Sequence, residues 1–209
     1  EPCRRRQNGQ AMVNTVIFLC VALGVVVALV ALWVMSIYNK LISLRNLYEN
    51  GFAQIDVQLK RRYDLIPNLV NTAKGYMAHE KETLEAVIQA RNQALSASTA
   101  AAANPGEEAA MNQLNSAESN LDGAIGRLLM IAESYPDLKA NENMLGIQEE
   151  LVSTENKIAF SRQSFNDSAT RYNTYLQQFP TNIIGGKFKF NNCQLFEVDE
   201  PTERNAPKV

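Results

Sequence analysis

The sharpest periodicity of the chain lies in Asn141–Phe179, NENMLGIQEELVSTENKIAFSRQSFNDSATRYNTYLQQF. Large apolar residues recur in it at every seventh position, namely Met144, Leu151, Ile158, Phe165, Tyr172 and Phe179. An unbroken seven-residue repeat is typical of a long helix in a bundle or coiled coil. The repeat predicts a helix from about Asn141 to Gln178 that buries this apolar stripe.

A second, shorter repeat precedes it. Its apolar positions are Leu114, Leu121, Leu128 and Tyr135, with Ile125 and Ala132 between them. They predict a helix from about Glu107 to Ser134. The turn signals Asn104–Gly106 and Tyr135–Asp137 mark its two ends.

The N-terminal half predicts two further helices. The first has apolar residues three and four positions apart, at Leu41, Leu44, Tyr48, Phe52, Ile55 and Leu59, and is expected to end near Tyr63. Asp64 is a candidate N-cap for the next helix, with Pro67 in its first turn. That helix is expected over about Leu65–Ala97, with an apolar face of Leu69, Ala73, Tyr76, Met77, Leu84, Val87, Ile88 and Leu95.

An uncharged apolar run, Val16–Met35, begins the first of these helices. Its length is sufficient to cross a bilayer as a helix. A cleaved signal peptide is the alternative, but no small-residue cleavage site followed by a polar break appears. The predicted fold is therefore all-α: one N-terminal transmembrane helix continuous with an antiparallel bundle of about four long helices. We divide the chain into an extension (1–12), the transmembrane helix (13–37), the bundle (38–180), and a C-terminal segment with a loose tail (181–209).

The orientation of the span depends on where the native chain starts. Arg4–Arg6 precede the span, whereas Lys40 and Arg45 follow it, and basic residues favour the cytoplasmic side. If translation begins at Met12, with 1–11 an added extension, the bundle is expected in the cytoplasm.

The composition gives little support to catalysis or nucleic-acid binding. The net charge of −2 and the pI of about 5.6 argue against a nucleic-acid partner. Cys3, Cys20 and Cys193 lack metal-ligand or redox spacing, and a disulfide between Cys3 and Cys193 is the alternative for one pair. His79-Glu80 resembles the start of a zinc-protease motif, but Thr83 stands where the second histidine is needed. We predict no catalytic, cofactor or metal residue, and no enzyme.

Three sets of residues are candidate contact sites. Lys60, Arg61 and Arg62 form a basic cluster for an anion or a partner, or else a helix face salt-bridged to nearby acids. Glu118, Glu155 and Arg162 occupy otherwise apolar heptad slots. They predict a polar network between helices, with a ligand or proton site as the alternative. Gly24 and Ala28 have the small-xxx-small spacing of packed transmembrane helices.

The order of several motifs along the chain resembles the LemA family. These are Tyr38–Ile42, Leu44–Asn46, Ala53–Arg62, Asp64–Val70, Gly75-Tyr76, His79-Glu80, Tyr135–Asn141, Gln148–Leu151, Thr154–Ala159, Tyr172-Asn173 and Phe179-Pro180. The resemblance covers about residues 13–190. It implies a membrane anchor and a long-helix bundle in a bacterial inner membrane, and it implies no known chemistry. A magnetosome-associated branch of the family is linked to membrane remodelling.

Two functions follow as hypotheses. The first is a non-enzymatic scaffold that acts in the bilayer through self-association or partner binding, with a role in membrane organisation or remodelling. The second is an accessory or regulatory subunit of a membrane enzyme such as a protease or transporter. Both predict the lipid bilayer as a partner. The first also predicts a homo-oligomer, and the second a membrane-protein partner.

Overall fold

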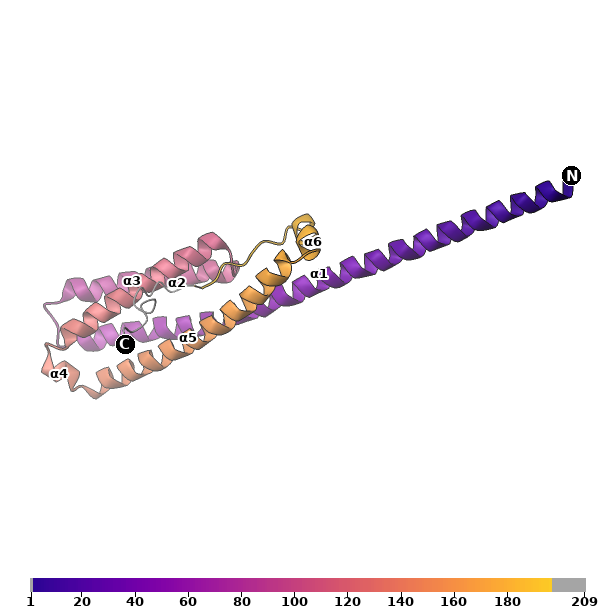
Figure 1. Ribbon diagram of the computed structural model, residues 1–209. Helices are drawn as coiled ribbons and strands as arrows, with labels where there is room; N and C mark the ends of the chain where they lie inside the picture. The colour runs from indigo at the N-terminus through magenta and orange to yellow at the C-terminus, as the bar shows by residue number, and fades with distance from the viewer. Residues whose placement is uncertain (1, 197–209) are drawn as a thin grey trace, which may run out of the picture.

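The computed structural model describes the backbone of residues 2–196 and the side chains of residues 17–196. Every regular element in this part of the chain is a helix, which confirms the all-α prediction (Figure 1). The helices are α1 (Pro2–Lys74), α2 (Lys81–Ala103), α3 (Glu108–Ala132), α4 (Pro136–Lys139), α5 (Glu142–Gln177) and α6 (Thr181–Lys187).

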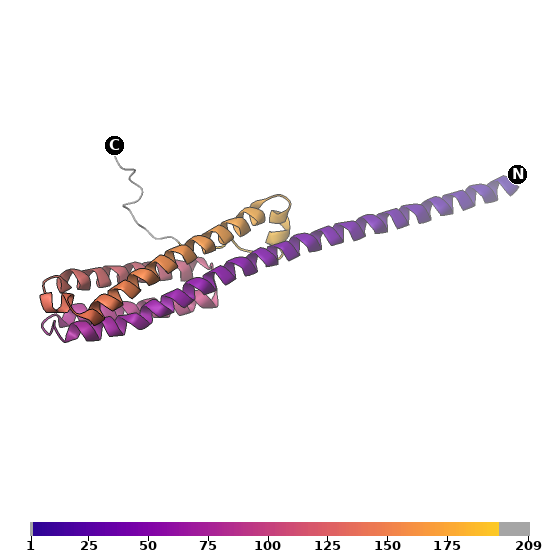
Figure 2. The same ribbon diagram turned by 90° about the horizontal axis from the view of Figure 1, so that it is seen from below.

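The helix α1 is the longest helix and the one against which α2, α5 and α6 pack. The C-terminal half of α1 packs closely against α2 and α5, and α2 packs in turn against α3. The N-terminal half of α1 extends far beyond the bundle (Figure 2). Long helices that follow one another run in opposite directions, as short connections require. The helices α3 and α5 approach each other less closely than the other neighbours do, and a groove remains between them.

The predicted break at Asp64 is wrong, because α1 continues through Pro67 to Lys74. Proline in a helix interior has no N–H, so the carbonyl four residues earlier loses its hydrogen-bond donor. Here that carbonyl belongs to Tyr63, and the Arg91 Nε donates to it from α2 at 3.1 Å. A side chain from the neighbouring helix thus replaces the missing bond. The first turn of the bundle falls instead between Lys74 and Lys81.

The seam between α1 and α5 is the tightest part of the core. A Cβ at Gly51 would lie 3.2 Å from the Cα of Phe165, so glycine permits the close approach of the two helices. The Phe165 ring is fully buried and meets Tyr48 and Phe52 edge-on, with ring centroids 6.3 and 5.8 Å away. Tyr172 stacks edge-on against Tyr48 one heptad later.

Most residues of the predicted apolar stripes are buried, but two expectations fail. Phe179 continues the heptad series in the sequence, yet its side chain is 80% exposed because α5 ends at Gln177. Tyr76 is exposed as well, since it lies in the turn after α1.

Both ends of α5 have a clear cause. The Asn141 side chain accepts a hydrogen bond from the Met144 backbone N–H at 3.1 Å and caps its start. Pro180 follows its end, and α6 then forms a single short helix. Gly185 and Gly186 lie inside α6.

The predicted span is unpartnered within the described side chains. The apolar residues from Ile17 to Met35 are mostly exposed, and none of the most apolar 18-residue window is buried. The expectations for the extension 1–12 and the tail after Phe196 lie outside the described side chains.

Candidate functional site

A buried charge cluster crosses the middle of the bundle, and Arg62 of α1 is its centre. The Arg62 guanidinium is ion-paired with Glu118 at 3.1 Å, with Glu155 at 3.3 Å, and with Asp122. Glu118 and Asp122 come from α3 and Glu155 from α5, so one cation links three helices. Burial opposes its charged form, but the carboxylates of Asp122, Glu155 and Glu118 hold the pKa of Arg62 above its ordinary value.

Glu118 is the most deeply buried acid of the cluster, at 2% exposed. It accepts hydrogen bonds from Arg62 and from the Tyr63 hydroxyl. Burial nevertheless raises the pKa of its carboxyl above the ordinary value. Burial also raises the pKa of Tyr63, and the Glu118 charge acts in the same direction. The tyrosine is therefore a neutral hydrogen-bond donor at neutral pH.

Arg162 of α5, predicted to join this network, occupies a different position in it. No ion pair joins it to a carboxylate among the described residues, and its buried Nε has no hydrogen-bond partner there. Its guanidinium Cζ lies 4.6 Å from the centre of the Phe196 ring, in a cation–π contact. Burial lowers the pKa of Arg162, opposed by the charges of Glu155, Glu118 and Asp122.

The charge cluster opens to solvent through the groove between α3 and α5. This groove has a volume of about 580 Å³, and Arg62, Asp122 and Glu155 lie along it. Asp122 and Glu155 are partly exposed here, with 43% and 45% of their side chains accessible. The arrangement resembles a structural ion network with one solvated edge more than an open charged pocket.

The run Lys60–Arg62 does not form one exposed basic patch. Lys60 pairs with Asp56 at 2.6 Å, and Arg61 pairs with Glu150 on α5. Arg62 faces inward, so only the first two could meet an anion, and each already has a carboxylate partner.

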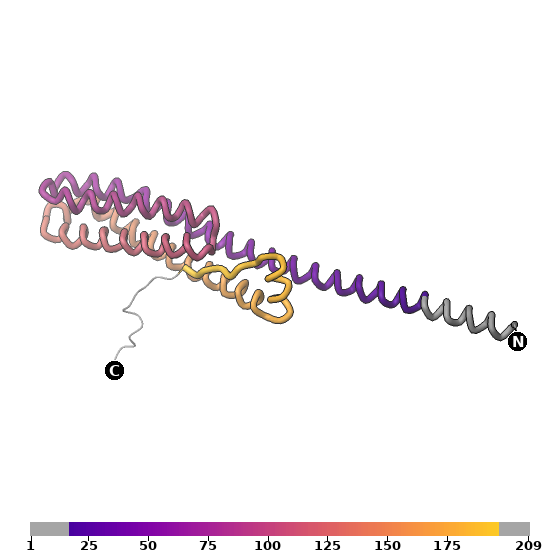
Figure 3. Tube along the Cα trace, turned by 90° about the horizontal axis from the view of Figure 1, so that it is seen from above, coloured from indigo at the N-terminus to yellow at the C-terminus, as the bar shows by residue number. Residues whose placement is uncertain are grey.

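The segment after α6 returns along the bundle as an extended strap, residues 188–196 (Figure 3). Two asparagines of α5, seven residues apart, hold its backbone. The side chain of Asn173 accepts from Cys193 N–H and donates to Cys193 C=O, both at 2.8 Å. Asn166 does the same for Phe196, at 2.9 and 3.1 Å. The sequence feature of α5 that accompanies these contacts is the seven-residue spacing of the two asparagines, each one position after a core aromatic residue.

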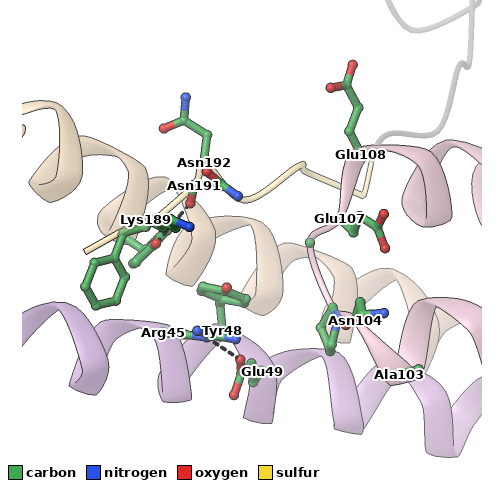
Figure 4. Close-up of a pocket in the computed structure, with 14 residues that line it drawn as sticks. Arg45, Tyr48, Glu49, Ala103, Asn104, Glu107, Glu108, Lys189, Asn191 and Asn192 are labelled. Carbon is green, nitrogen blue, oxygen red and sulfur yellow. Dashed lines mark hydrogen bonds and ion pairs between the residues drawn. The ribbon is translucent and has the colours of Figure 1, made fainter. Parts of the chain in front are cut away.

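A polar cleft of about 790 Å³ lies where the strap passes the α2–α3 turn (Figure 4). Arg45 and Glu49, paired at 2.8 Å, form its α1 wall, and Lys189, Asn191 and Asn192 of the strap lie opposite. At its side, Gly106 has φ +84°, and a Cβ there would lie 2.3 Å from the Cys193 sulfur. The strap and this turn therefore fit together only with glycine.

The cleft offers no acid–base pair suited to neutral pH among the groups with shifted pKa values. The Glu49 hydrogen bond raises the pKa of Arg45, and burial raises those of Tyr48 and Tyr172. All three shifts move away from neutrality, whereas general acids and bases work best near it.

The residues of the described part form no cluster of three or more His, Cys, Asp or Glu able to hold a metal ion. His79 is exposed in the α1–α2 turn. Cys193 is a free, buried thiol whose pKa burial raises to about 12, so it is not a ready nucleophile. Gly24 and Ala28 lie on the exposed apolar part of α1, and nothing lies within 4 Å of a Cβ built at Gly24.

The comparisons with known proteins agree with the motifs. A sequence model of the LemA family matches residues 51–209. The chain is similar to a protein named LemA from Metamycoplasma hominis, 28% identical over 162 residues that cover 78% of this chain and 69% of the relative. It is also similar to magnetosome protein MamQ 2 of Paramagnetospirillum magneticum, 24% identical over 82% of this chain and 68% of that one. The MamQ of Magnetospirillum gryphiswaldense is 25% identical over 76% of this chain and 64% of that protein.

The matched region contains the charge cluster, the asparagines that hold the strap, and all of α2 to α6. It begins after the motif Tyr38–Asn46, which therefore lies outside it. Since the match covers well over half of the chain, this protein belongs to the LemA family.

Proposed function

We propose that this protein is a membrane-anchored, non-enzymatic scaffold that holds its bundle in a fixed position relative to the bilayer and arranges copies of itself or other proteins there. One observation carries the proposal: α1 is a single helix whose exposed apolar segment continues without a break into a half that is buried within the bundle.

The first half of α1 supports anchoring. Its most apolar window has a mean hydropathy of 3.0, and none of it is buried by the rest of the chain. A core helix of a soluble domain would be covered, and a cleaved leader would not continue as a core helix. A helix of this length and composition is instead matched to the hydrocarbon core of a bilayer.

The second half of α1 supports rigid coupling. Phe52, Ile55 and Leu59 are at most 1% exposed, so the helix that leaves the bilayer is also the central element of the core. A bending linker would need a break such as glycine or an unsatisfied proline between the two halves, whereas α1 is helical throughout.

Exposed apolar side chains favour a protein partner. Val152 and Phe160 on α5 are 64% and 73% exposed, and both line a shallow groove with Gln58 of α1. Large exposed apolar groups of this kind mark interaction surfaces. The partner is a second copy in the scaffold hypothesis, and a membrane enzyme in the accessory-subunit alternative.

Self-association is tested on the full-length protein in nanodiscs and in mild detergent, by light scattering. The scaffold hypothesis predicts a mass well above one chain. Gly24→Ile should lower this mass, because the larger side chain blocks close approach of anchor helices at Gly24 and Ala28. Val26→Ile is the matched control, since position 26 lies on the opposite side of the helix.

A full-length chain that remains monomeric in both environments would contradict the scaffold hypothesis. A stoichiometric enzyme that co-purifies from native membranes would favour the accessory-subunit alternative. For a chain translated from Met12, we expect the bundle on the cytoplasmic side of a bacterial inner membrane, because Lys40 and Arg45 then provide the basic flank of the apolar segment. Protease digestion of spheroplasts should then leave the bundle intact.

A further inference from the structure

The end of the bundle nearest the anchor carries large apolar side chains that do not join the core. Phe179, Ile183 and Phe188 are 80%, 63% and 49% exposed. They belong to the α5–α6 turn, to α6 and to the residue after it. Figures 1 and 2 show that this cap, residues 179–190, is the part of the bundle closest to the N-terminal half of α1. Such a gathering at one end of a small domain indicates a surface that is normally covered.

The position of the cap along α1 indicates what covers it. The Tyr38 ring of α1 packs edge-on against Phe188 and Phe190, with centroids 5.0 and 5.6 Å apart. Ile37 is buried, and Val34, one turn earlier, is already partly buried against the core. The cap therefore begins beside the last turn of the apolar segment. Tyr38 lies about 4.5 Å beyond Met35 along the helix, and the headgroup layer is about 5–8 Å thick.

The chemistry of the cap suits the headgroup layer. Phe179, Ile183 and Lys187 are spaced by four positions, and all three are exposed. Lys189 is exposed as well, and the sequence from Gln178 to Phe190 contains no acidic residue. Apolar side chains beside lysines are typical of a surface that lies on a bilayer, with the rings at the acyl boundary and the amines on phosphates.

We propose that the cap rests on the surface of the bilayer that α1 spans, with Phe179 and Ile183 inserted at the headgroup–acyl boundary and Lys187 directed to lipid phosphates. This inference depends on the proposal that α1 is a membrane anchor. It also gives Phe179 a role: the residue keeps the apolar character of the heptad series, but its partner is lipid. Two contacts with the membrane, the span and the cap, then fix the tilt of the bundle.

The test uses tryptophan fluorescence of the full-length protein in nanodiscs that contain phosphatidylcholine, phosphatidylglycerol and a lipid brominated near the headgroup. Trp33 is the single tryptophan of the chain, so the unmodified protein reports the anchor. In a Trp33→Phe background, Phe179→Trp reports the cap. Met130→Trp, at a similarly exposed position on α3 outside the proposed partner groove, is the matched control. Ile183→Trp provides a second probe of the cap should the first variant fail to fold.

The proposal predicts that the tryptophan at position 179 or 183 emits at shorter wavelength and is quenched severalfold more by brominated lipid than the one at position 130. Equal, weak quenching at the cap and at position 130 would overturn it. A blue-shifted but unquenched signal would overturn it too, because protein and not lipid would then cover the cap. If Trp33 itself is unquenched, the anchor proposal fails. If Trp33 is quenched and the cap is not, only the present inference fails.

Discussion

Replacing Arg62 with methionine should destabilise the bundle chiefly by isolating Glu118. Of the three carboxylates around Arg62, only Glu118 is shielded from water, with 3% of its side chain exposed against 43% for Asp122 and 45% for Glu155. Methionine is about as long as the arginine stem, so little cavity forms. Removing one partner of a buried ion pair typically costs about 3–5 kcal/mol.

The carboxyl's own titration limits this cost. An isolated buried carboxylate takes up a proton when that costs less than remaining charged. For an ordinary pKa of 4.5, protonation at pH 7 costs about 3.4 kcal/mol, at about 1.36 kcal/mol per pH unit. Arg62→Met should therefore lower the unfolding free energy by up to about 3 kcal/mol at pH 7, and this loss should shrink by up to about 1.4 kcal/mol for each unit of lower pH.

The sign of the pH effect follows from the raised pKa of Glu118. A carboxyl whose pKa is raised on folding binds its proton more tightly in the folded state, so protonation favours folding. The destabilisation caused by ionised Glu118 is absent below 4.5, the pKa of the carboxyl in the unfolded chain. It grows as the pH rises to the pKa of the carboxyl in the folded chain. Removing the Arg62 charge raises the pKa of Glu118 in the folded chain further, so the destabilisation continues to grow up to a higher pH.

The measurement is urea unfolding of the full-length chain in mild detergent, followed by circular dichroism from pH 5 to pH 8. Adding Glu118→Gln to Arg62→Met should restore much of the loss and remove its pH dependence. Lys60→Met is the control: the Lys60 side chain is 60% exposed, and its pair with Asp56 should contribute less than about 1 kcal/mol. A loss below about 1 kcal/mol for Arg62→Met, or one that does not change with pH, would show that Glu118 is not an isolated buried charge in the variant.

Two further substitutions test the core and the strap. Phe165→Ala should cost about 3–5 kcal/mol because the ring is fully buried, whereas Phe160→Ala, five residues away and exposed, should change the same unfolding curve by less than about 0.5 kcal/mol. Asn173→Ala removes both bonds to Cys193 and should cost about 1–3 kcal/mol, with faster amide exchange confined to the strap. Equal losses for the two phenylalanines, or an unchanged exchange rate in residues 191–196, would contradict these assignments.

The long periodic helices could be predicted because their signals are local. The seven-residue repeats of α3 and α5 placed both helices within a residue or two of their observed ends. The failure at Asp64 and Pro67 has a distant cause, since the carbonyl that Pro67 leaves free is satisfied by Arg91 on another helix. No rule based on neighbouring residues could include that bond. The predicted burial of Phe179 is wrong for a different reason: the seven-residue repeat continues in the sequence after the helix has ended.

The candidate site was predictable only in part. Glu118 and Glu155 interrupt apolar stripes in the sequence, which predicts a polar network, and the structure brings both to the Arg62 guanidinium. The burial of Arg62 could not be predicted, because it belongs to a run of three basic residues that resembles a solvated helix face. The strap could not be predicted either, because its contacts join asparagine side chains to backbone groups, which leave no pattern in residues 188–196.

Under the proposed function, α1 connects the bilayer to the bundle as one uninterrupted helix. Amide hydrogen exchange of the full-length protein in nanodiscs, read by mass spectrometry over peptides from Trp33 to Phe52, tests it most directly. The region contains the end of the apolar segment, the contacts of Tyr38 with the cap, and the first core residues of the bundle. A continuous helix predicts slow exchange through the whole stretch, with no fast interval between the membrane and Leu41. Rapid exchange of residues 36–41, flanked by slow exchange on both sides, would show a flexible linker and contradict the rigid scaffold.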